Sequence, residues 1–200
     1  MSAMHPANAA RLKRMDTAAT IAASAAAATL LAGGALYAGM WPMSQIYGET
    51  LIAGDDPAEV ALTYDDGPSP DHTPALLDLL ARHNAHATFF LMGEHVRRYP
   101  QLARRIADEG HSIGNHTMTH PNLLWSSLAT TRRELTECQQ VIVDTTGVTP
   151  RLFRPPFGAR TPATLHIARA LHLEAVMWNV TAKDWEPISV AAIVANAEPT

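Results

Sequence analysis

Two histidines and two adjacent aspartates are the residues of this sequence best suited to hold a metal ion. His116 and His120 stand four residues apart, a spacing that brings both imidazoles to one side within a helical turn. Asp65 and Asp66 are neighbours locked by the following Gly67-Pro68, and like charges so close repel each other unless a cation offsets them. Two histidines and one aspartate make the three-ligand set of a catalytic zinc-type site, with one position left for water.

Each pair has a plainer interpretation when it is taken alone. A histidine pair at this spacing is weak evidence for a metal, and an aspartate pair is also typical of a solvated turn or a helix cap. A closed structural zinc site uses four ligands, usually with several cysteines, whereas this chain has one. The two pairs together therefore favour a metal site with an open position.

The residues around these clusters alternate between strand and helix patterns. We expect strands at 60–64, 87–92, 111–114, 152–153 and 175–180, and helices at 73–83, through Leu102 and Ile106 to Gly110, and at 128–146, 162–171 and 188–197. This order predicts an α/β fold with a parallel sheet, either open and doubly wound or closed into a barrel.

In both arrangements, ligands gather at the carboxyl ends of the strands. The unusual polar clusters of this sequence each follow a predicted strand: Asp65-Asp66, the segment 116–120, Arg154 and Asp184. We therefore expect these clusters to meet on one face of the sheet.

Composition excludes some functions. Apolar residues make up 47% of the 200 residues and charged residues 17%, which suits one globular domain with a short attachment. The formal net charge of -4 gives no electrostatic reason to expect a nucleic-acid partner. The single cysteine, Cys138, excludes an internal disulfide framework, and we expect it to be a small packed residue.

The N-terminus is typical of a targeting segment. Basic residues cluster in the segment 1–16, and the apolar segment 17–41 that follows is longer than the about 20 residues that span a membrane. Small residues at Gly33, Ala35 and Ala38 also suit a signal peptidase, so a transmembrane anchor and a cleaved signal both remain open. By the positive-inside rule, segment 1–16 is cytoplasmic and the chain beyond 41 faces outward. Residues 42–58 are predicted to be a linker and 59–200 the folded domain.

Four strings of residues, in order, resemble the motifs of the polysaccharide deacetylases, the NodB-homology domain of carbohydrate esterase family four. They are TYDDGPSPDHTP (63–74), EGHSIGNHTMTHP (109–121), FRPPFG (153–158) and MWNVTAKDW (177–185). The resemblance implies a distorted (β/α) barrel. It also implies a metal-dependent hydrolase that removes N-acetyl groups from a polysaccharide, such as peptidoglycan or a chitin-like polymer of N-acetylglucosamine.

The resemblance also implies a role for each matching residue. Asp65 would be the general base, while Asp66, His116 and His120 would bind zinc or another divalent metal. Arg154 would line the groove and fix the base. Three further positions match: the Phe157 backbone NH as an oxyanion contact, Asp184 tuning the acid, and Trp185 shaping the acetate pocket.

One family feature has no counterpart. The family's general acid is a histidine in a Leu-x-His motif beyond the fourth string, and no histidine follows His172. We therefore expect the domain to be truncated before its last motif.

A glycan-binding pseudoenzyme and an O-acetyl xylan esterase with the same metal centre are the alternative functions. The N-terminal segment places the domain outside the cytoplasm, either at the cell membrane or, after signal cleavage, as a secreted or periplasmic protein. The remaining histidines are interpreted as surface or structural: His83, His86, His95 and His111.

Overall fold

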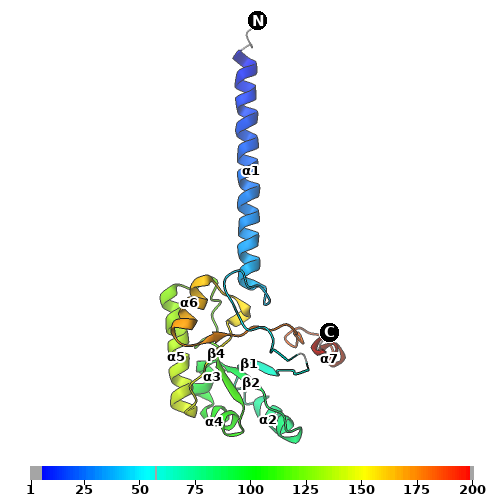
Figure 1. Cartoon of the computed structure of the whole chain (residues 1–200), viewed down its shortest axis with the longest axis vertical. Helices are drawn as coiled ribbons and strands as arrows, with labels where there is room; N and C mark the ends of the chain where they lie inside the picture. The colour runs from blue at the N-terminus through cyan, green and yellow to red at the C-terminus, as the bar shows by residue number, and fades with distance from the viewer. Residues whose placement is uncertain (1–5, 57, 199–200) are drawn as a thin grey trace. The chain divides into compact units, whose positions relative to one another are not determined.

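The N-terminal part of the chain is one long helix. The structure is a computed structural model that describes residues 6–56 and 58–198, with the side chains of Thr17 and of residues from 19 onward. Helix α1 (Pro6–Met40) contains the 22-residue stretch Ala19–Met40, in which an 18-residue window has a mean hydropathy of 1.6, high enough for a membrane span (Figure 1). A signal sequence passes the same test, so anchor and signal both stay predictions. The first residues of the predicted cytoplasmic segment, 1–5, and the side chains of its basic cluster lie outside the described residues.

The rest of the chain is built on a five-stranded parallel sheet in the order β1-β2-β3-β4-β5. The strands are β1 (Thr63–Gly67), β2 (Thr88–Leu91), β3 (Ser112–Asn115), β4 (Leu152–Phe153) and β5 (Glu174–Ala175). Each strand pairs with the next one in sequence, and the order never reverses. A doubly wound sheet requires a reversal, whereas a (β/α) barrel winds in one direction. The α/β expectation is confirmed, and the winding is that of the barrel class.

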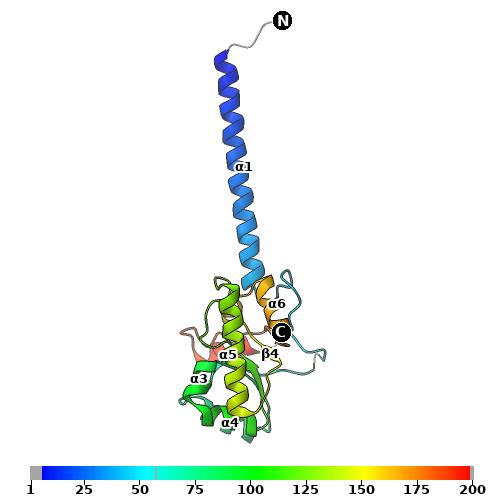
Figure 2. The ribbon, with the colours of Figure 1, turned by 90° about the vertical axis from the view of Figure 1, so that its left-hand side faces the viewer.

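Helices occupy the connections between the strands. They are α2 (Thr73–Arg82), α3 (Gly93–Arg98), α4 (Pro100–Asp108), α5 (Leu128–Thr146), the short 3-10 helix η1 (Pro156–Gly158), α6 (Pro162–Ala170) and α7 (Val190–Ala197). Helix α5 packs against α3, α4 and α6 (Figure 2). The sequence predicts the main helices closely because their caps are explicit: the Ser127 side chain accepts from the amide of Thr130, and Gly147 ends α5 at a φ of 73°. Helix α3 was not predicted.

Alternate residues of β2 face opposite sides of the sheet, as the strand geometry requires. Phe89 and Leu91 belong to an apolar cluster shared with α2, α3, α4 and α5. Phe90 is fully buried and stacks on the guanidinium of Arg154, 4.2 Å from its ring centroid. Cys138 is buried in the apolar cluster, and burial raises the pKa of its thiol to about 12, as expected for a packed, unreactive cysteine.

The segment between α1 and β1 contacts the domain. Leu51 forms a parallel bridge with Val176, next to β5. The buried side chain of Arg160 donates to the carbonyl oxygens of Trp41 and Ser44, at 3.0 and 2.6 Å. Nothing in the Pro- and Gly-containing sequence of 42–58 indicates these contacts. The predicted strand 175–180 is wrong in extent, since regular pairing covers only Glu174–Ala175 and the bridge at Val176.

Candidate metal centre

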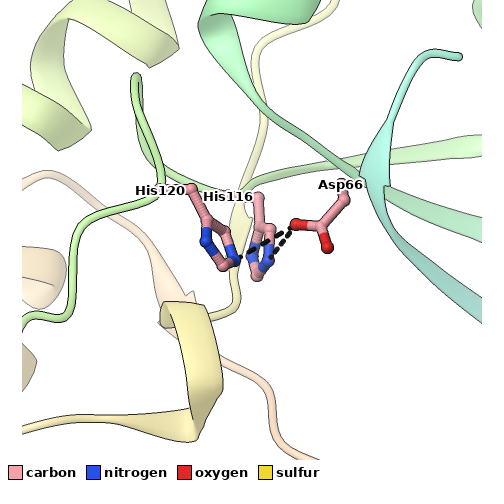
Figure 3. Close-up of side chains that lie close together, drawn as sticks. All are labelled: Asp66, His116 and His120. Atoms are coloured by element: carbon pink, nitrogen blue, oxygen red, sulfur yellow. Dashed lines mark ion pairs between the residues drawn. The ribbon is translucent and has the colours of Figure 1, made fainter. Parts of the chain in front are cut away.

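Asp65 and Asp66 end the first strand and point in different directions. Asp66 has a φ of 63°, in the left-handed region that few non-glycine residues adopt, and this turns its carboxylate away from the side that Asp65 faces. Oδ1 of Asp65 lies 2.9 Å from Nη1 of Arg154. Oδ1 of Asp66 lies 3.3 Å from Nε2 of His116 and 3.2 Å from Nε2 of His120 (Figure 3). Asp65 therefore pairs with the arginine, while its neighbour Asp66 faces the two histidines.

The segment that carries the two histidines is a bend that follows β3, so the predicted helical turn is wrong. Thr117 and His120 have φ values of 68° and 60°, which no α-helix contains. Hydrogen bonds within the bend compensate for this backbone strain: Thr117 N donates to Oδ1 of Asn115, and His120 N donates to Oγ1 of Thr117. The result still brings both rings to one side, with centroids 5.0 Å apart (Figure 3).

The start of α3 holds the same bend from the other side. The amides of Gly93 and Glu94 donate to the carbonyls of Thr117 and Met118, both at 3.0 Å. A Cβ at position 93 would collide with the sulfur of Met118. Glycine therefore suits this close approach of α3 to the bend.

The three side chains fit a metal ion. One ligand atom from each of Asp66, His116 and His120 lies within 4.8 Å of the others. Two ligands that share a tetrahedral zinc ion, with bonds of about 2.0–2.1 Å, lie about 3.3 Å apart, which is close to the distances from Asp66 to both rings. Nδ1 of His116 donates to the carbonyl of Arg154 at 2.7 Å, and this contact orients the ring so that Nε2 faces Asp66.

The pKa shifts of Asp66 and His120 both favour the protonation state in which each side chain could bind a metal. The hydrogen bond from His116 lowers the pKa of Asp66, and the charges of the nearby histidines add to this effect against burial. Burial lowers the pKa of His120, although Asp66 opposes the shift. An ionised carboxylate and a neutral imidazole are the forms that coordinate metals.

Arg154 is almost fully buried and holds Asp65. Its Nη1 donates to Asp65 and to Oγ1 of Thr63, while Nη2 and Nε donate to the carbonyls of Met177 and Val176. Burial lowers the pKa of this guanidinium, and Asp65 opposes the shift, so the group stays charged. The arrangement gives Asp65 one oriented oxygen facing the arginine, and its side chain remains about one-third exposed.

The remaining predicted site residues divide into two groups. Phe157 lies beside the metal centre: its ring contacts His120 edge-on, with centroids 4.6 Å apart, and its φ is 58°. Asp184 and Trp185 lie on an exposed segment, and in the described part of the chain no hydrogen bond or ion pair links Asp184 to Asp65. Burial raises the pKa of the Tyr64 hydroxyl, and the negative charge of Asp184 raises it further.

Two residues of the site were missed. His95, interpreted as surface or structural, donates through Nδ1 to the carbonyl oxygen of Asp66 at 2.7 Å. Glu134 accepts two hydrogen bonds from Thr119, which stands between the two histidines. The sequence does contain a pattern that indicates Glu134, because this acidic residue lies on the apolar face of α5 with Leu135 and Cys138. No sequence pattern indicates His95.

The chain is similar to members of a known protein family. Residues 53–176 match the polysaccharide deacetylase family. The chain is 41% identical to a peptidoglycan-N-acetylglucosamine deacetylase of Bacillus cereus over 139 residues, which is 70% of this chain and 50% of that protein. It is 39% identical to a chitooligosaccharide deacetylase of Rhizobium leguminosarum, over 71% of this chain and 66% of the relative. The chain thus spans about half the length of the first relative.

Solved structures are similar as well. A peptidoglycan N-acetylglucosamine deacetylase superposes with a TM-score of 0.71 at 38% identity, over 74% of this chain and 69% of that one. A CE4 family pseudoenzyme from Bacillus anthracis superposes with a TM-score of 0.66 at 29% identity, over 68% and 48%. The resemblance inferred from the four sequence motifs is therefore confirmed at the level of the fold and the family.

Proposed function

Because this chain belongs to the polysaccharide deacetylase family, we propose that it hydrolyses N-acetyl groups of a polysaccharide built on N-acetylglucosamine. Peptidoglycan is the favoured substrate and a chitin-like oligomer the second, since similar proteins carry both names. The single observation that carries the proposal is the placement of the Asp66, His116 and His120 group beside an aspartate, Asp65, that a buried arginine holds.

A divalent metal, with zinc the first choice, is proposed as the cofactor. One carboxylate oxygen and two imidazole nitrogens are a donor set that suits zinc, and three protein ligands leave a position open. The hydrogen bond from Nδ1 of His116 to a backbone carbonyl supports this role, because such outer contacts orient metal-binding imidazoles. The metal would supply Lewis acidity towards the acetamide carbonyl.

Asp65 is proposed as the general base. Its carboxylate would accept the proton of the attacking water, while Arg154 keeps one carboxylate oxygen fixed. The backbone NH of Phe157 would donate to the carbonyl oxygen of the acetyl group as negative charge develops there. Phe157 has a strained left-handed backbone and an exposed ring next to His120, which supports a place at the substrate. The leaving amine must receive a proton, a step that the family resemblance assigns to the histidine of a Leu-x-His motif. Asp184 would tune that acid, and Trp185 would shape the acetate pocket.

The site is open, which suits a polymer. The side chain of Asp66 is 61% exposed, and the aromatic rings of Phe157 and Trp185 are exposed as well. An exposed site with aromatic rings at the surface suits a chain of sugars lying across it.

The experiment that tests this function combines a metal measurement with an activity measurement. The chain should bind about one zinc ion, and a form that carries the Leu-x-His motif of the family should release acetate from an N-acetylglucosamine oligomer or from peptidoglycan. A chelator should abolish release, and added zinc should restore it. Acetate release that is unaffected by metal removal would contradict the proposal.

A glycan-binding pseudoenzyme is the second candidate, because a similar solved structure is a pseudoenzyme. It predicts metal and glycan binding without acetate release. The presence of Asp65 with its Arg154 partner favours the enzyme. Release of acetate from O-acetylated xylan, and not from N-acetylated glycans, would instead identify an esterase.

We propose that α1 anchors the protein in the cell membrane with the domain outside, because Ala19–Met40 is long and apolar enough to span. The protein should then stay in membranes washed with carbonate. A mature protein that begins near residue 36 or 39 would show a cleaved signal and a secreted or periplasmic product.

A further inference from the structure

One acidic side chain stands in the apolar face of α5. Glu134 is 5% exposed, and its neighbours on the same face are the fully buried Leu135 and Cys138. In the part of the chain that the structure describes, no arginine, lysine or histidine forms an ion pair with it. A buried carboxylate without a cation is costly unless hydrogen bonds satisfy its oxygens.

The hydrogen bonds of Glu134 come from one residue. Oε2 accepts the backbone N–H of Thr119 at 2.8 Å, and Oε1 accepts the hydroxyl of Thr119 at 2.9 Å. Both carboxylate oxygens are therefore used, and each bond to a charged acceptor is stronger than a bond between neutral groups. Helix α5 fixes the glutamate, because buried residues surround it on the same helix face.

Thr119 is the residue that precedes His120 in the bend. His120 has a φ of 60°, a conformation that costs free energy in a residue other than glycine, so neighbouring contacts must hold it. The α3 amides hold Thr117 and Met118, and Thr117 receives the amide of His120. Glu134 supplies the contact at Thr119, the last residue before the second histidine.

We propose that Glu134 is a positioning residue of the metal centre, which acts through Thr119 to keep His120 within reach of the ion shared with His116 and Asp66. The inference rests on the proposed function only in taking these three side chains as metal ligands. A carboxylate suits this task because it accepts two donors at once in a fixed geometry. The amide of a glutamine offers one oxygen, and its NH₂ group would face a second donor.

The test is a zinc titration of the metal-free full chain against a competing chelator. Glu134→Gln removes the second acceptor and the charge, and Thr119→Val removes one donor while the charge of Glu134 stays. Both variants should bind zinc about 10–100-fold more weakly, the usual effect of an outer contact on a ligand. Thr119→Ser keeps both donors and should recover most of the affinity.

Glu137→Gln is the matched control. Glu137 lies about one turn further along α5 and is exposed. The substitution Glu137→Gln therefore removes the same charge as Glu134→Gln at a side chain that faces solvent. Its zinc affinity should stay within about twofold of that of the unmodified chain, since exposed charges contribute little. A second measurement uses the metal-free protein: hydrogen exchange at the amide of Thr119 should be faster in Glu134→Gln and unchanged in Glu137→Gln.

The outcomes separate this inference from the proposed function. Zinc binding by the unmodified chain that neither Glu134→Gln nor Thr119→Val weakens would overturn the role of Glu134 and leave the proposed function standing. An equal loss of zinc affinity in Glu137→Gln would show that the effect comes from charge alone, and it would also overturn the positioning role of Glu134. No zinc binding by the unmodified chain would overturn both. If Glu134→Gln does not fold, Thr119→Val decides the question.

Discussion

The carbonyl oxygen of Arg154 accepts a hydrogen bond from Nδ1 of His116 at 2.7 Å. The guanidinium of the same arginine donates to Asp65 at 2.9 Å. One residue thus orients a proposed metal ligand through its backbone and the proposed base through its side chain. Substitution of that side chain should therefore affect the two functions differently.

Arg154→Lys should lower the deacetylation rate by about 10²-fold, because a lysine cannot reproduce the arginine fork and Asp65 would lose its orientation. Zinc affinity should change little, since the partner of His116 is a backbone carbonyl that the substitution keeps. Parallel measurements of turnover and zinc affinity test this, with the exposed Arg151→Lys as control. An equal loss of zinc affinity and rate would show that the side chain supports the whole site.

The sequence predicts which residues meet, and less well how they meet. The side chains of Asp66, His116 and His120 come together at the carboxyl ends of the strands, where the sequence predicts that they meet. The segment with the two histidines is a bend and not the expected helical turn. Its backbone is held by contacts with Gly93, which is distant in the sequence, and with Asn115, which ends the preceding strand. Spacing within a motif carries no information about such partners.

The fold was predictable where local signals are strong. Glycine and capping residues mark the ends of α5 and α6, and apolar runs mark β2 and β3. The strand order could not be read from the pattern, since an open sheet and a barrel share the same alternation. Helix α3 and the contacts of Arg160 also escaped prediction, because long-range contacts rather than local sequence determine them.

The pH dependence of stability should include a contribution from His111. This ring is buried, its Nδ1 accepts the amide of Ala87, and burial lowers its pKa from the ordinary value of 6.5, with Glu109 opposing and His86 adding to the shift. The unfolded chain therefore binds the proton first as the pH falls. The contribution is present above pH 6.5 and is lost as the pH drops towards the lower pKa of the folded state.

Replacing this ring tests the assignment. His111→Asn keeps an acceptor for Ala87 but cannot titrate, so its unfolding free energy should depend less on pH below 6.5. The difference in slope should approach, at most, about 1.4 kcal/mol for each pH unit, the effect of one proton. Urea unfolding of the metal-free chains between about pH 5 and 7.5 measures it. Identical slopes in the two proteins would contradict the assignment.

Arg160 should contribute more to stability than to function. Its side chain is fully buried and donates to the carbonyls of Gly158, Trp41, Pro42 and Ser44. Arg160→Met should destabilise the domain by about 3 kcal/mol or more, because several buried carbonyls lose their donor. Thermal unfolding measures the change, and Arg104→Met, at an exposed arginine, should cost at most about 1 kcal/mol. Equal losses in the two variants would disprove the structural role of Arg160.

The measurement that tests the account most directly compares Asp65→Asn with Asp66→Asn, two isosteric changes at neighbouring residues. Zinc affinity and deacetylation rate are measured for both on an N-acetylglucosamine oligomer, in a form of the chain that includes the family's Leu-x-His motif. Asp66→Asn should weaken zinc binding by at least about 100-fold, because a ligand is lost rather than an outer contact. Asp65→Asn should keep zinc bound while the rate falls by about 10²–10⁴-fold, the usual contribution of a general base. Equal loss of zinc from both variants, or a near-normal rate in Asp65→Asn, would contradict the division of roles between these two aspartates.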